Sequence, residues 1–236
     1  MDDRFLGGRV LVRQPTDGFR SGLDAVMLAA AVPARAGDVA LELGAGAGAA
    51  SLCLAERVAD CRVTAVEIEP ALTNLIREST KSNNAAVEAV CADVFDLPQE
   101  LKREFAHVFC NPPFHEGEVS PDAARDRALR DTGRLADWME MGVRRTVSGG
   151  TFTTIVRADR LGEALAALPV SGIALFPLWP RAGEPAKRVI VQSTKGARAP
   201  LALLGGLVLH EADGRYTREA DEVLRDGAAL RLARRA

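Results

Sequence analysis

Short apolar runs alternate with helix-like segments along most of this chain, and the alternation predicts its fold. In the helix-like segments the apolar residues recur every three to four positions, a spacing typical of amphipathic helices, whereas the short runs predict buried strands. Strands separated by helices pair in parallel through right-handed crossovers, so the pattern predicts an α/β fold with a doubly wound, mostly parallel sheet. The expected strands cover residues 38–43, 61–68, 86–93, 105–111, 149–157, 170–179 and 187–195; the expected helices cover 47–58, 70–82, 134–147, 159–168 and about 217–233, and an apolar stretch lies at 201–211.

The first part of the chain precedes this regular pattern. Residues 8–15 alternate between apolar and polar side chains and predict a hairpin strand. Residues 21–34 predict a helix that Pro33 stops, with Ser21 or Asp24 as its N-cap.

The last predicted strands differ from the earlier ones in how they must connect. No crossover helix fits between 170–179 and 187–195, so we expect 187–195 to pair antiparallel with 170–179. With no repeat and no low-complexity linker, we divide the chain into an N-terminal extension, residues 1–36, and a main domain, residues 37–236.

Composition indicates a globular protein of ordinary character. The chain has 236 residues, 47% of them hydrophobic and 26% charged, with a formal net charge of −2. Nucleic-acid binding would therefore depend on a local basic patch rather than on global charge. The N-terminus, MDDRFLGGRV, lacks the apolar core of a signal peptide and the apolar stretches are too short to span a bilayer, so we expect a cytoplasmic protein without membrane contact.

The cysteines and histidines do not follow metal-ligand spacings. Apolar surroundings and the lack of a C-x-x-C pair predict buried free thiols at Cys53, Cys61, Cys91 and Cys110. His107 falls within a predicted strand, His210 close to another and His115 in a polar loop, where a solvated role is favoured over that of a general base. We expect no metal.

A glycine-rich turn follows the first predicted strand of the main domain. Gly44, Gly46 and Gly48 fall where the chain enters the next helix, and small residues there let the backbone and the helix N-terminus approach a ligand closely. The same spacing also satisfies a dinucleotide-binding pattern, so it is weakly specific. Glu42 changes the balance, because a carboxylate beside the turn would repel a pyrophosphate but suit an ammonium or sulfonium cation.

Acidic residues end the next two predicted strands as well. Glu67 is placed to accept both hydroxyls of a ribose, and Asp93 to accept from an adenine amino group. Glu69 is expected to cap the helix that begins at Pro70. Together with Glu42, these strand-end acids predict a site for S-adenosylmethionine across the switch point of the sheet.

The stretch CNPPFHEGE, residues 110–118, ends the fourth strand of the main domain. Pro112 and Pro113 cannot continue a paired central strand, so the chain should form a stiff projection. The amide oxygen of Asn111 and the carbonyl of Pro112 would then accept both hydrogens of an exocyclic amine and align its lone pair with a methyl donor. Phe114 offers a face on which a planar substrate can stack.

These motifs resemble the class I S-adenosylmethionine-dependent methyltransferases, which have a Rossmann-like fold. Within that class the N-P-P-[YF] signature marks the enzymes that transfer a methyl group to a planar nitrogen. The matching stretches are LELGAGAG, VEIEP, CADVFD and NPPF. The flanks, residues 14–30 and 200–224, are similar to the bacterial adenine-N6 methyltransferases that act at adenine-37, beside the anticodon of valine tRNA. Phe114 departs from the commoner tyrosine, as in some guanine-N2 enzymes of ribosomal RNA.

The resemblance implies a role for each matching position. The catalytic projection would be Asn111, Pro112, Pro113 and Phe114. The cofactor-binding positions would be Ser21, Asp24, Glu42, Gly44, Ala45, Gly46, Gly48, Glu67, Ile68, Asp93, Val94 and Asn111.

Contact with the RNA partner should come from local basic clusters. Phosphate contacts of this kind make binding sensitive to salt, although neighbouring aspartates could neutralise several of the arginines. We also expect the polar loop 115–131 to become ordered on RNA. The basic residues are Arg125, Arg127, Arg130 and Arg134, followed by Arg144 and Arg145, and then Lys187, Arg188, Lys195 and Arg198.

Four functions compete at this point. The first is an RNA adenine-N6 methyltransferase. The second is a methyltransferase acting on another planar nitrogen, either guanine-N2 of ribosomal RNA or a protein glutamine amide. The third is an NAD-dependent oxidoreductase, against which Glu42 and the NPPF projection argue. The fourth is a non-catalytic cofactor-binding module, which would not need an intact NPPF projection.

Overall fold

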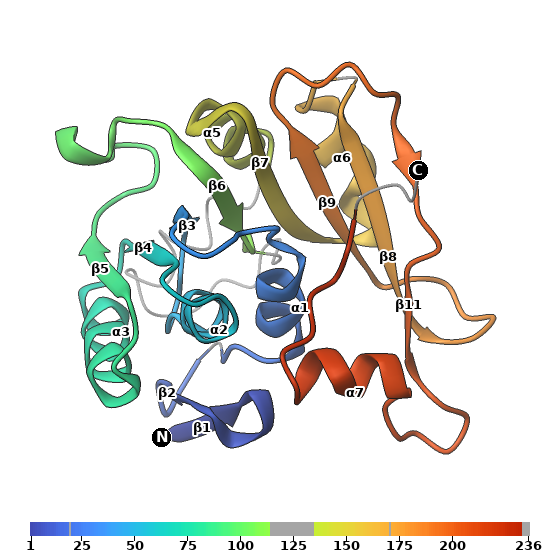
Figure 1. Ribbon diagram of the computed structural model, residues 1–236, viewed down its shortest axis with the longest axis horizontal. Coiled ribbons are helices and arrows are strands. Elements are labelled where there is room, and N and C mark those ends of the chain that lie inside the picture. The colour runs from blue at the N-terminus through green and yellow to red at the C-terminus, as the bar shows by residue number, and fades with distance from the viewer. Residues whose placement is uncertain (19, 114–134, 170, 233–236) are drawn as a thin grey trace.

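A single mixed sheet organises the chain in the computed structural model, which describes residues 1–18, 20–113, 135–169 and 171–232 (Figure 1). Its strands lie in the order β10-β8-β9-β7-β6-β3-β4-β5, and β11 also pairs with β8. The predicted doubly wound, mostly parallel α/β fold is confirmed, because β5, β4, β3, β6 and β7 pair in parallel. The strands are β3 (Val39–Leu43), β4 (Arg62–Glu67), β5 (Val87–Cys91), β6 (Phe105–Cys110), β7 (Thr146–Arg157), β8 (Ile173–Arg181), β9 (Arg188–Thr194), β10 (Ala202–Leu203) and β11 (Leu207–His210).

Helices cover both faces of this sheet, and each face has its own apolar core. Alternation along β3 sends Ala40 into the core beneath α1 and α2, and Leu41 and Leu43 into the core beneath α5. Strands buried on both faces explain why the sequence reads as continuous apolar runs. The described helices are α1 (Leu23–Ala31), α2 (Ala49–Arg57), α3 (Pro70–Asn83), α5 (Leu135–Arg144), α6 (Leu161–Ala166) and α7 (Arg218–Leu224), with 3-10 turns η1 (Leu6–Gly8), η2 (Gln99–Leu101) and η4 (Ala158–Arg160).

The late strands follow the prediction in one respect and extend it in another. Strand β9 is antiparallel to β8, as expected, and it also lies between β8 and β7. The stretch 201–211 forms two short strands, β10 and β11, both parallel to β8. Gly206 separates them with φ +77°, and a Cβ there would lie 2.2 Å from the carbonyl oxygen of Pro177, so the backbones touch at this break.

The N-terminal segment forms the predicted hairpin and shares the core of one sheet face. Strand β2 (Val10–Arg13) pairs with β1 (Asp2–Phe5), a strand that the sequence pattern did not reveal. The capping prediction is wrong: Gly22 occupies the N-cap of α1 and no side chain caps it. Asp24 lies within the first turn of the helix, and its carboxylate accepts a hydrogen bond from Nε of Arg188 at 2.9 Å.

The C-terminal helix is shorter than the predicted 217–233. Thr217 caps α7 by accepting a hydrogen bond from the backbone N–H of Ala220, and the helix ends at Leu224. Gly227 then adopts φ +72° and packs near Leu6 and Arg9 of the N-terminal segment. Figure 1 shows the hairpin and α7 on the same side of the sheet as α1. The segment that follows α7 therefore lies against the N-terminal segment and α1.

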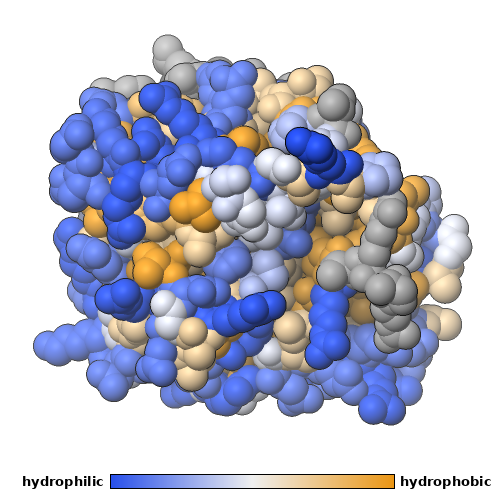
Figure 2. All heavy atoms as spheres, turned by 45° about the horizontal axis from the view of Figure 1, so that its top comes forward, coloured by the Kyte–Doolittle hydropathy of each residue, from blue (hydrophilic) through white to orange (hydrophobic). Residues whose placement is uncertain are grey.

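The molecular surface exposes few large apolar side chains. Figure 2 shows hydrophobic residues as small separate patches among hydrophilic ones on the face that it presents. Across the described residues, the exposed large hydrophobics are Met1, Ile68, Leu201, Leu203 and Tyr216. No described helix is long and apolar enough to cross a membrane. Single exposed apolar side chains such as these are common on protein surfaces and do not by themselves mark a contact site.

Three of the four thiols match the sequence prediction. Cys53, Cys61 and Cys110 are buried and free, whereas Cys91 is free but exposed, because it ends the edge strand β5. His107 is held between the Oγ of Thr151 and the carboxylate of Asp38, at 2.8 Å and 3.1 Å. The described residues contain no cluster of potential metal ligands.

A matched pair of glycines tests the packing of α5 against the sheet. A Cβ on Gly142 of α5 would lie 2.1 Å from the ring of Phe152, whereas a Cβ on Gly162 of α6 would meet no atom within 4 Å. We expect Gly142→Ala to lower the free energy of unfolding by about 1–3 kcal/mol through overpacking. Gly162→Ala should be neutral or add up to about 1 kcal/mol. Urea denaturation of both variants measures this, and equal effects would contradict the packing described.

Candidate active site

The central feature of the site is the pairing of β3 with β6. The two strands are parallel with Leu43 opposite Cys110, so the next residues, Gly44 and Asn111, lie side by side at their carboxyl ends. The glycine turn and the start of the Asn-Pro-Pro projection are therefore neighbours. The amide oxygen of Asn111 is buried and has no hydrogen-bond partner among the described residues. A buried acceptor without a partner is costly in a folded protein, and here it lies beside the glycine turn.

Only part of the predicted catalytic projection falls within the described chain. Pro112 is buried and Pro113 half-buried, directly after Asn111. Phe114 and His115 lie outside the described residues. The described part of the projection therefore brings the Asn111 amide and the two prolines to the carboxyl edge of the sheet.

The glycine turn owes its shape to backbone conformations that disfavour larger residues. Gly44 and Gly48 have φ +68° and +82°, and a Cβ at Gly44 would lie 2.6 Å from the indole of Trp138. Gly48 is the N-cap of α2, and a Cβ there would press on Ile76 at 3.0 Å. Gly46 also has a positive φ, but a Cβ there would meet nothing within 4 Å. The turn is thus tight on its inner side and open at Gly46.

Glu67 holds the turn from the neighbouring strand. It is the last residue of β4, only 7% exposed, and its Oε2 accepts a hydrogen bond from the N–H of Gly46 at 2.7 Å. Its Oε1 accepts from the N–H of Glu69 at 3.0 Å. Burial raises the pKa of this carboxyl, and the backbone N–H donors oppose that shift. Each carboxylate oxygen has a second lone pair, so Glu67 can still accept from a ligand.

Glu42 lies deeper than its sequence position implied. Its side chain is 3% exposed, and Oε2 accepts from the N–H of Ser51 at 2.9 Å and from the Ser51 hydroxyl. Burial raises the pKa of Glu42 to about 8 despite these hydrogen bonds. The argument that its negative charge selects a cation needs correction, because the carboxyl is mostly protonated at neutral pH and faces α2. A role for Glu42 toward the cofactor stays a prediction.

The loops after β4 and β5 carry the other predicted cofactor residues. Ile68 is 53% exposed and adjoins Glu67. Asp93 is exposed and lies two residues beyond the end of β5, not on the strand as predicted; its Oδ1 accepts from the N–H of Phe95 at 2.8 Å. Val94 is buried in the core beneath α5. Glu69 occupies the N-cap of α3 as predicted, but through its backbone carbonyl and not through its side chain.

Two aromatic residues that the sequence did not single out stand behind the glycine turn. The indole of Trp138, on α5, occupies the space that a Cβ on Gly44 would need. The same indole makes an edge-to-face pair with Phe95, with ring centroids 5.6 Å apart. Its Nε1 is buried without a partner among the described residues. Helical spacing explains Trp138 as a core residue, so only the three-dimensional contact reveals its position next to the turn.

Ser21 and Asp24, predicted to bind the cofactor, have hydrogen-bond partners within the protein. The backbone N–H of Ser21 donates to Oε1 of Gln14, and the Ser21 carbonyl accepts from Nε2 of the same residue. Asp24 is tied to Arg188, as described above. These contacts link the hairpin, α1 and β9 at the carboxyl edge of the sheet. Direct contact of Ser21 or Asp24 with a cofactor stays a prediction.

The predicted basic residues do not form one cluster. Lys187 and Arg188 lie at the end of β9 that pairs with Arg157, the carboxyl end of β7. Lys195 lies at the opposite end of β9 and binds Glu104 at 2.6 Å, so it cannot join the same patch.

The other basic residues add little to a patch near the site. Arg145 is buried where β6 and β7 begin, and burial, together with Arg144, lowers its pKa. Arg144 and Arg198 are exposed. Arg144 is the last residue of α5 and directly precedes Arg145, so it lies at the end of the sheet where β7 begins. Arg125, Arg127, Arg130 and Arg134 lie outside the described residues.

Comparison with known proteins agrees with the fold. Residues 22–136 match the family described as methyltransferase small domain. A tRNA1(Val) (adenine(37)-N6)-methyltransferase of Aeromonas hydrophila is 28% identical over 83% of this chain and 84% of its own. An enzyme of the same name from Shewanella baltica is 24% identical over 89% of this chain and 92% of its own.

A solved structure also resembles this chain over most of its length. The crystal structure of a predicted O-methyltransferase from Agrobacterium tumefaciens is 30% identical, has a TM-score of 0.74, and is aligned over 88% of this chain and 98% of its own. Strand order, glycine turn and this likeness define a Rossmann-like fold of the methyltransferase class. The chain belongs to the methyltransferase family.

Glu42→Gln tests the buried carboxyl beneath the turn. The folded protein retains the Glu42 proton up to a pH of about 8, whereas an unfolded chain releases it near 4.5, so the wild type loses stability as pH rises between these values. Glutamine cannot ionise. We expect the stability of Glu42→Gln relative to wild type to rise by at least about 2 kcal/mol between pH 5 and pH 8.5.

Denaturant unfolding at several pH values measures this difference. Glu88→Gln, which changes an exposed carboxylate on β5, is the matched control and should follow the wild-type profile. Parallel profiles for Glu42→Gln and wild type would show that Glu42 does not carry the buried proton.

Proposed function

We propose that S-adenosylmethionine binds across the carboxyl ends of β3, β4 and β5. The fit of this group is supported by the open face at Gly46, the buried carboxylate of Glu67 and the exposed side chain of Ile68. Glu67 would accept from the ribose hydroxyls, and Ile68 would pack against the adenine with Asp93 and Val94 beside it. Gly44, Ala45, Gly46 and Gly48 would let the backbone approach the cofactor closely.

We further propose that the chain transfers a methyl group to an exocyclic amino nitrogen, and the observation that carries this is Asn111. Its buried amide oxygen, without a described partner, lies next to the glycine turn. Oriented with the Pro112 carbonyl, it would accept the amine hydrogens and stabilise positive charge that develops on nitrogen. The cofactor supplies an electrophilic methyl group when bound. Pro113 stiffens the projection, and Phe114 would stack on the base.

The substrate we propose is N6 of an adenine in tRNA, at position 37 beside the anticodon of valine tRNA. Two relatives that align with most of this chain carry that activity in their names. Lys187 and Arg188, at the carboxyl edge of the sheet, are candidate phosphate contacts. Arg125, Arg127, Arg130 and Arg134 stay predicted RNA contacts. We propose a cytoplasmic location, because the relatives are named as enzymes that modify tRNA.

Glu67→Ala tests the cofactor site. We expect the dissociation constant for S-adenosylhomocysteine to rise roughly 10- to 100-fold, because the variant loses the charged acceptor and releases the N–H of Gly46. Calorimetry with S-adenosylhomocysteine and NAD measures this. Glu69→Ala, whose side chain makes no cap on α3, serves as control. Tight binding of NAD alone would overturn the assignment in favour of an oxidoreductase.

Asn111→Ala tests the transfer step separately from cofactor binding. We expect the turnover number to fall roughly 100-fold or more while affinity for S-adenosylhomocysteine changes little. Asn74→Ala removes an exposed amide on α3 and should leave both quantities unchanged. Unchanged turnover in Asn111→Ala would show that this amide is not catalytic.

Nucleoside mass spectrometry identifies the methylated base. Transfer RNA and ribosomal RNA are each incubated with the enzyme and labelled cofactor. N6-methyladenosine in valine tRNA supports the proposal. N2-methylguanosine in ribosomal RNA would replace it with the guanine-N2 activity that Phe114 leaves open.

A further inference from the structure

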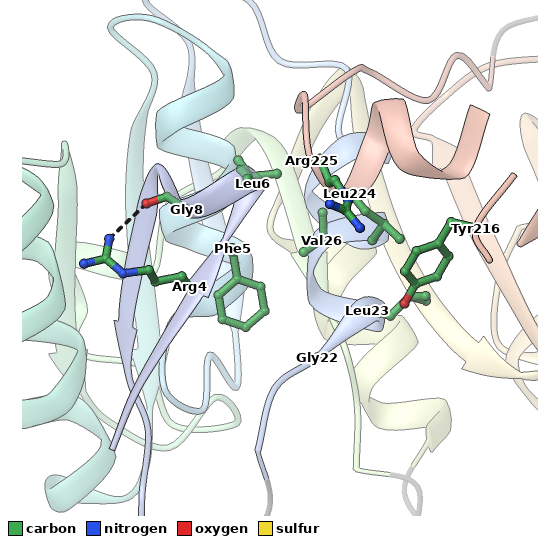
Figure 3. Close-up of a pocket in the computed structure, with 11 residues that line it drawn as sticks. Arg4, Phe5, Leu6, Gly8, Gly22, Leu23, Val26, Tyr216, Leu224 and Arg225 are labelled. Carbon is green, nitrogen blue, oxygen red and sulfur yellow. Dashed lines mark hydrogen bonds between the residues drawn. The ribbon is translucent and has the colours of Figure 1, made fainter. Parts of the chain in front are cut away.

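The space behind the glycine turn is filled by one side chain, that of Trp138. A Cβ on Gly44 would lie 2.6 Å and 3.0 Å from Cη2 and Cζ3 of its indole, so the ring rests against the bare backbone of the turn. A cavity of about 310 Å³ opens elsewhere, between the β1–η1 segment, the first turn of α1 and α7, and none of its described lining residues belongs to the candidate active site (Figure 3). The turn itself is thus backed by a packed ring and not by a hollow.

The same ring also reaches the loop that follows β5. Its edge-to-face contact with Phe95 has an interplanar angle of 80°. Phe95 is held by Asp93, whose Oδ1 accepts its backbone N–H, and Val94 between them is buried in the same apolar core as Trp138. One indole therefore contacts two loops that β4 separates in the sheet: the glycine turn after β3 and the loop after β5.

Core packing alone does not explain an indole at this position. Trp138 is 7% exposed, and its Nε1 is buried without a hydrogen-bond partner among the described residues. A buried donor without a partner is costly, and phenylalanine or leucine would fill an apolar core without that cost. Nε1 of Trp179, the other tryptophan of the chain, does have a partner: it donates to the carbonyl of Gly205 at 3.0 Å. The reach of the indole accounts for its use, because its six-membered ring supplies the atoms that meet Gly44.

Both loops that Trp138 contacts carry positions proposed to bind the cofactor. Gly44 opens the turn that Glu67 holds through the N–H of Gly46, and Asp93 and Val94 are proposed to lie beside the adenine. A protein interior is packed closely enough to transmit small displacements, so a change in the ring would move one loop relative to the other. The spacing between the two ends of the cofactor site then depends on this side chain.

We propose that Trp138 is a positioning residue for the cofactor. Its indole fixes the spacing between the glycine turn and the loop after β5, so that one ligand can bind both. This inference rests on the proposed function, since it requires S-adenosylmethionine at these loops. It gives α5 a part in cofactor binding, although the helix carries none of the strand-end motifs.

The two tryptophans of the chain allow a matched test. Trp138→Phe shortens the ring and should raise the dissociation constant for S-adenosylhomocysteine roughly 5- to 50-fold, while turnover at saturating S-adenosylmethionine stays close to the wild-type value. Trp179→Phe, on β8, loses a hydrogen-bonded indole three strands away from β3 and should leave the dissociation constant unchanged. Calorimetry measures affinity, and urea denaturation measures the stability of each variant. Reduced stability of Trp138→Phe with wild-type affinity would show a core residue only and would overturn the proposal.

A compensating pair of substitutions tests the contact itself. Gly44→Ala places a Cβ against the indole on a backbone with φ +68°, so it should weaken binding of S-adenosylhomocysteine. The smaller ring of Trp138→Phe leaves space for that Cβ. The double variant should therefore bind roughly 3-fold or more tightly than the product of the two single effects predicts. Strictly multiplicative effects would show that the two residues act independently, against the proposal.

The indole N–H provides an independent readout in the wild-type protein. Because the chain has two tryptophans, ¹⁵N-labelled protein gives two indole N–H resonances, and Trp179→Phe assigns them. Saturating S-adenosylhomocysteine should shift the Trp138 resonance, since the ligand binds both loops that contact its ring, and should leave the Trp179 resonance in place. A Trp138 resonance that does not move at saturation would contradict the proposed role.

The outcomes separate this proposal from the function on which it rests. If the wild type binds S-adenosylhomocysteine and Trp138→Phe binds it equally well, the positioning role fails and the proposed function stands. If the wild type binds neither S-adenosylhomocysteine nor S-adenosylmethionine, the proposed cofactor site itself fails.

Discussion

The register between β3 and β6 is the constraint on which the site depends. Parallel pairing places Leu43 opposite Cys110, and only this register puts Gly44 and Asn111 side by side. A slip of one residue would turn Leu41 and Leu43 away from the core beneath α5 and would bring Glu42 into it. The apolar cores on the two faces of the sheet therefore fix the register, and through it the distance between the glycine turn and the Asn-Pro-Pro projection. Packing far from the ligand-binding edge sets the geometry at that edge.

Buried polar groups complete what the register begins. Glu67 binds the backbone of Gly46 from the adjacent strand, and Glu42 binds Ser51 in the first turn of α2. The two carboxyl groups thus fasten the glycine turn at one end and the helix that follows it at the other. Both are withdrawn from water, which raises the pKa of each. Asn111 differs from them, because its buried oxygen has no partner among the described residues. The two hydrogen-bonded carboxyl groups hold the turn and the helix after it in place. The Asn111 oxygen, which has no partner among the described residues, is the acceptor that we propose for a ligand.

Sequence reasoning succeeded where local pattern determines structure. Apolar runs, crossover helices and the missing crossover before β9 were enough to predict the sheet and its antiparallel strand. It failed where a distant partner decides the outcome. Asp24 lies inside the first turn of α1 and binds Arg188, far along the chain, and the C-terminal helix ends early where Gly227 packs against the N-terminal segment. Charge clusters along the sequence were misleading for the same reason, since Lys187 and Lys195 occupy opposite ends of one strand. The neighbouring positions of the strand-end residues were predictable because parallel strand ends converge; their protonation and hydrogen-bond partners were not.

The two termini give this methyltransferase fold features beyond its central sheet. The hairpin, α1 and α7 share one apolar core, and the backbone N–H of Leu230 donates to the carbonyl of Ala30 at the end of α1. The first turn of α1 lines a cavity together with Tyr216 and also holds Asp24 toward Arg188. Because the sheet edge supplies chemistry common to many planar amines, selection among substrates must depend on surfaces outside that edge.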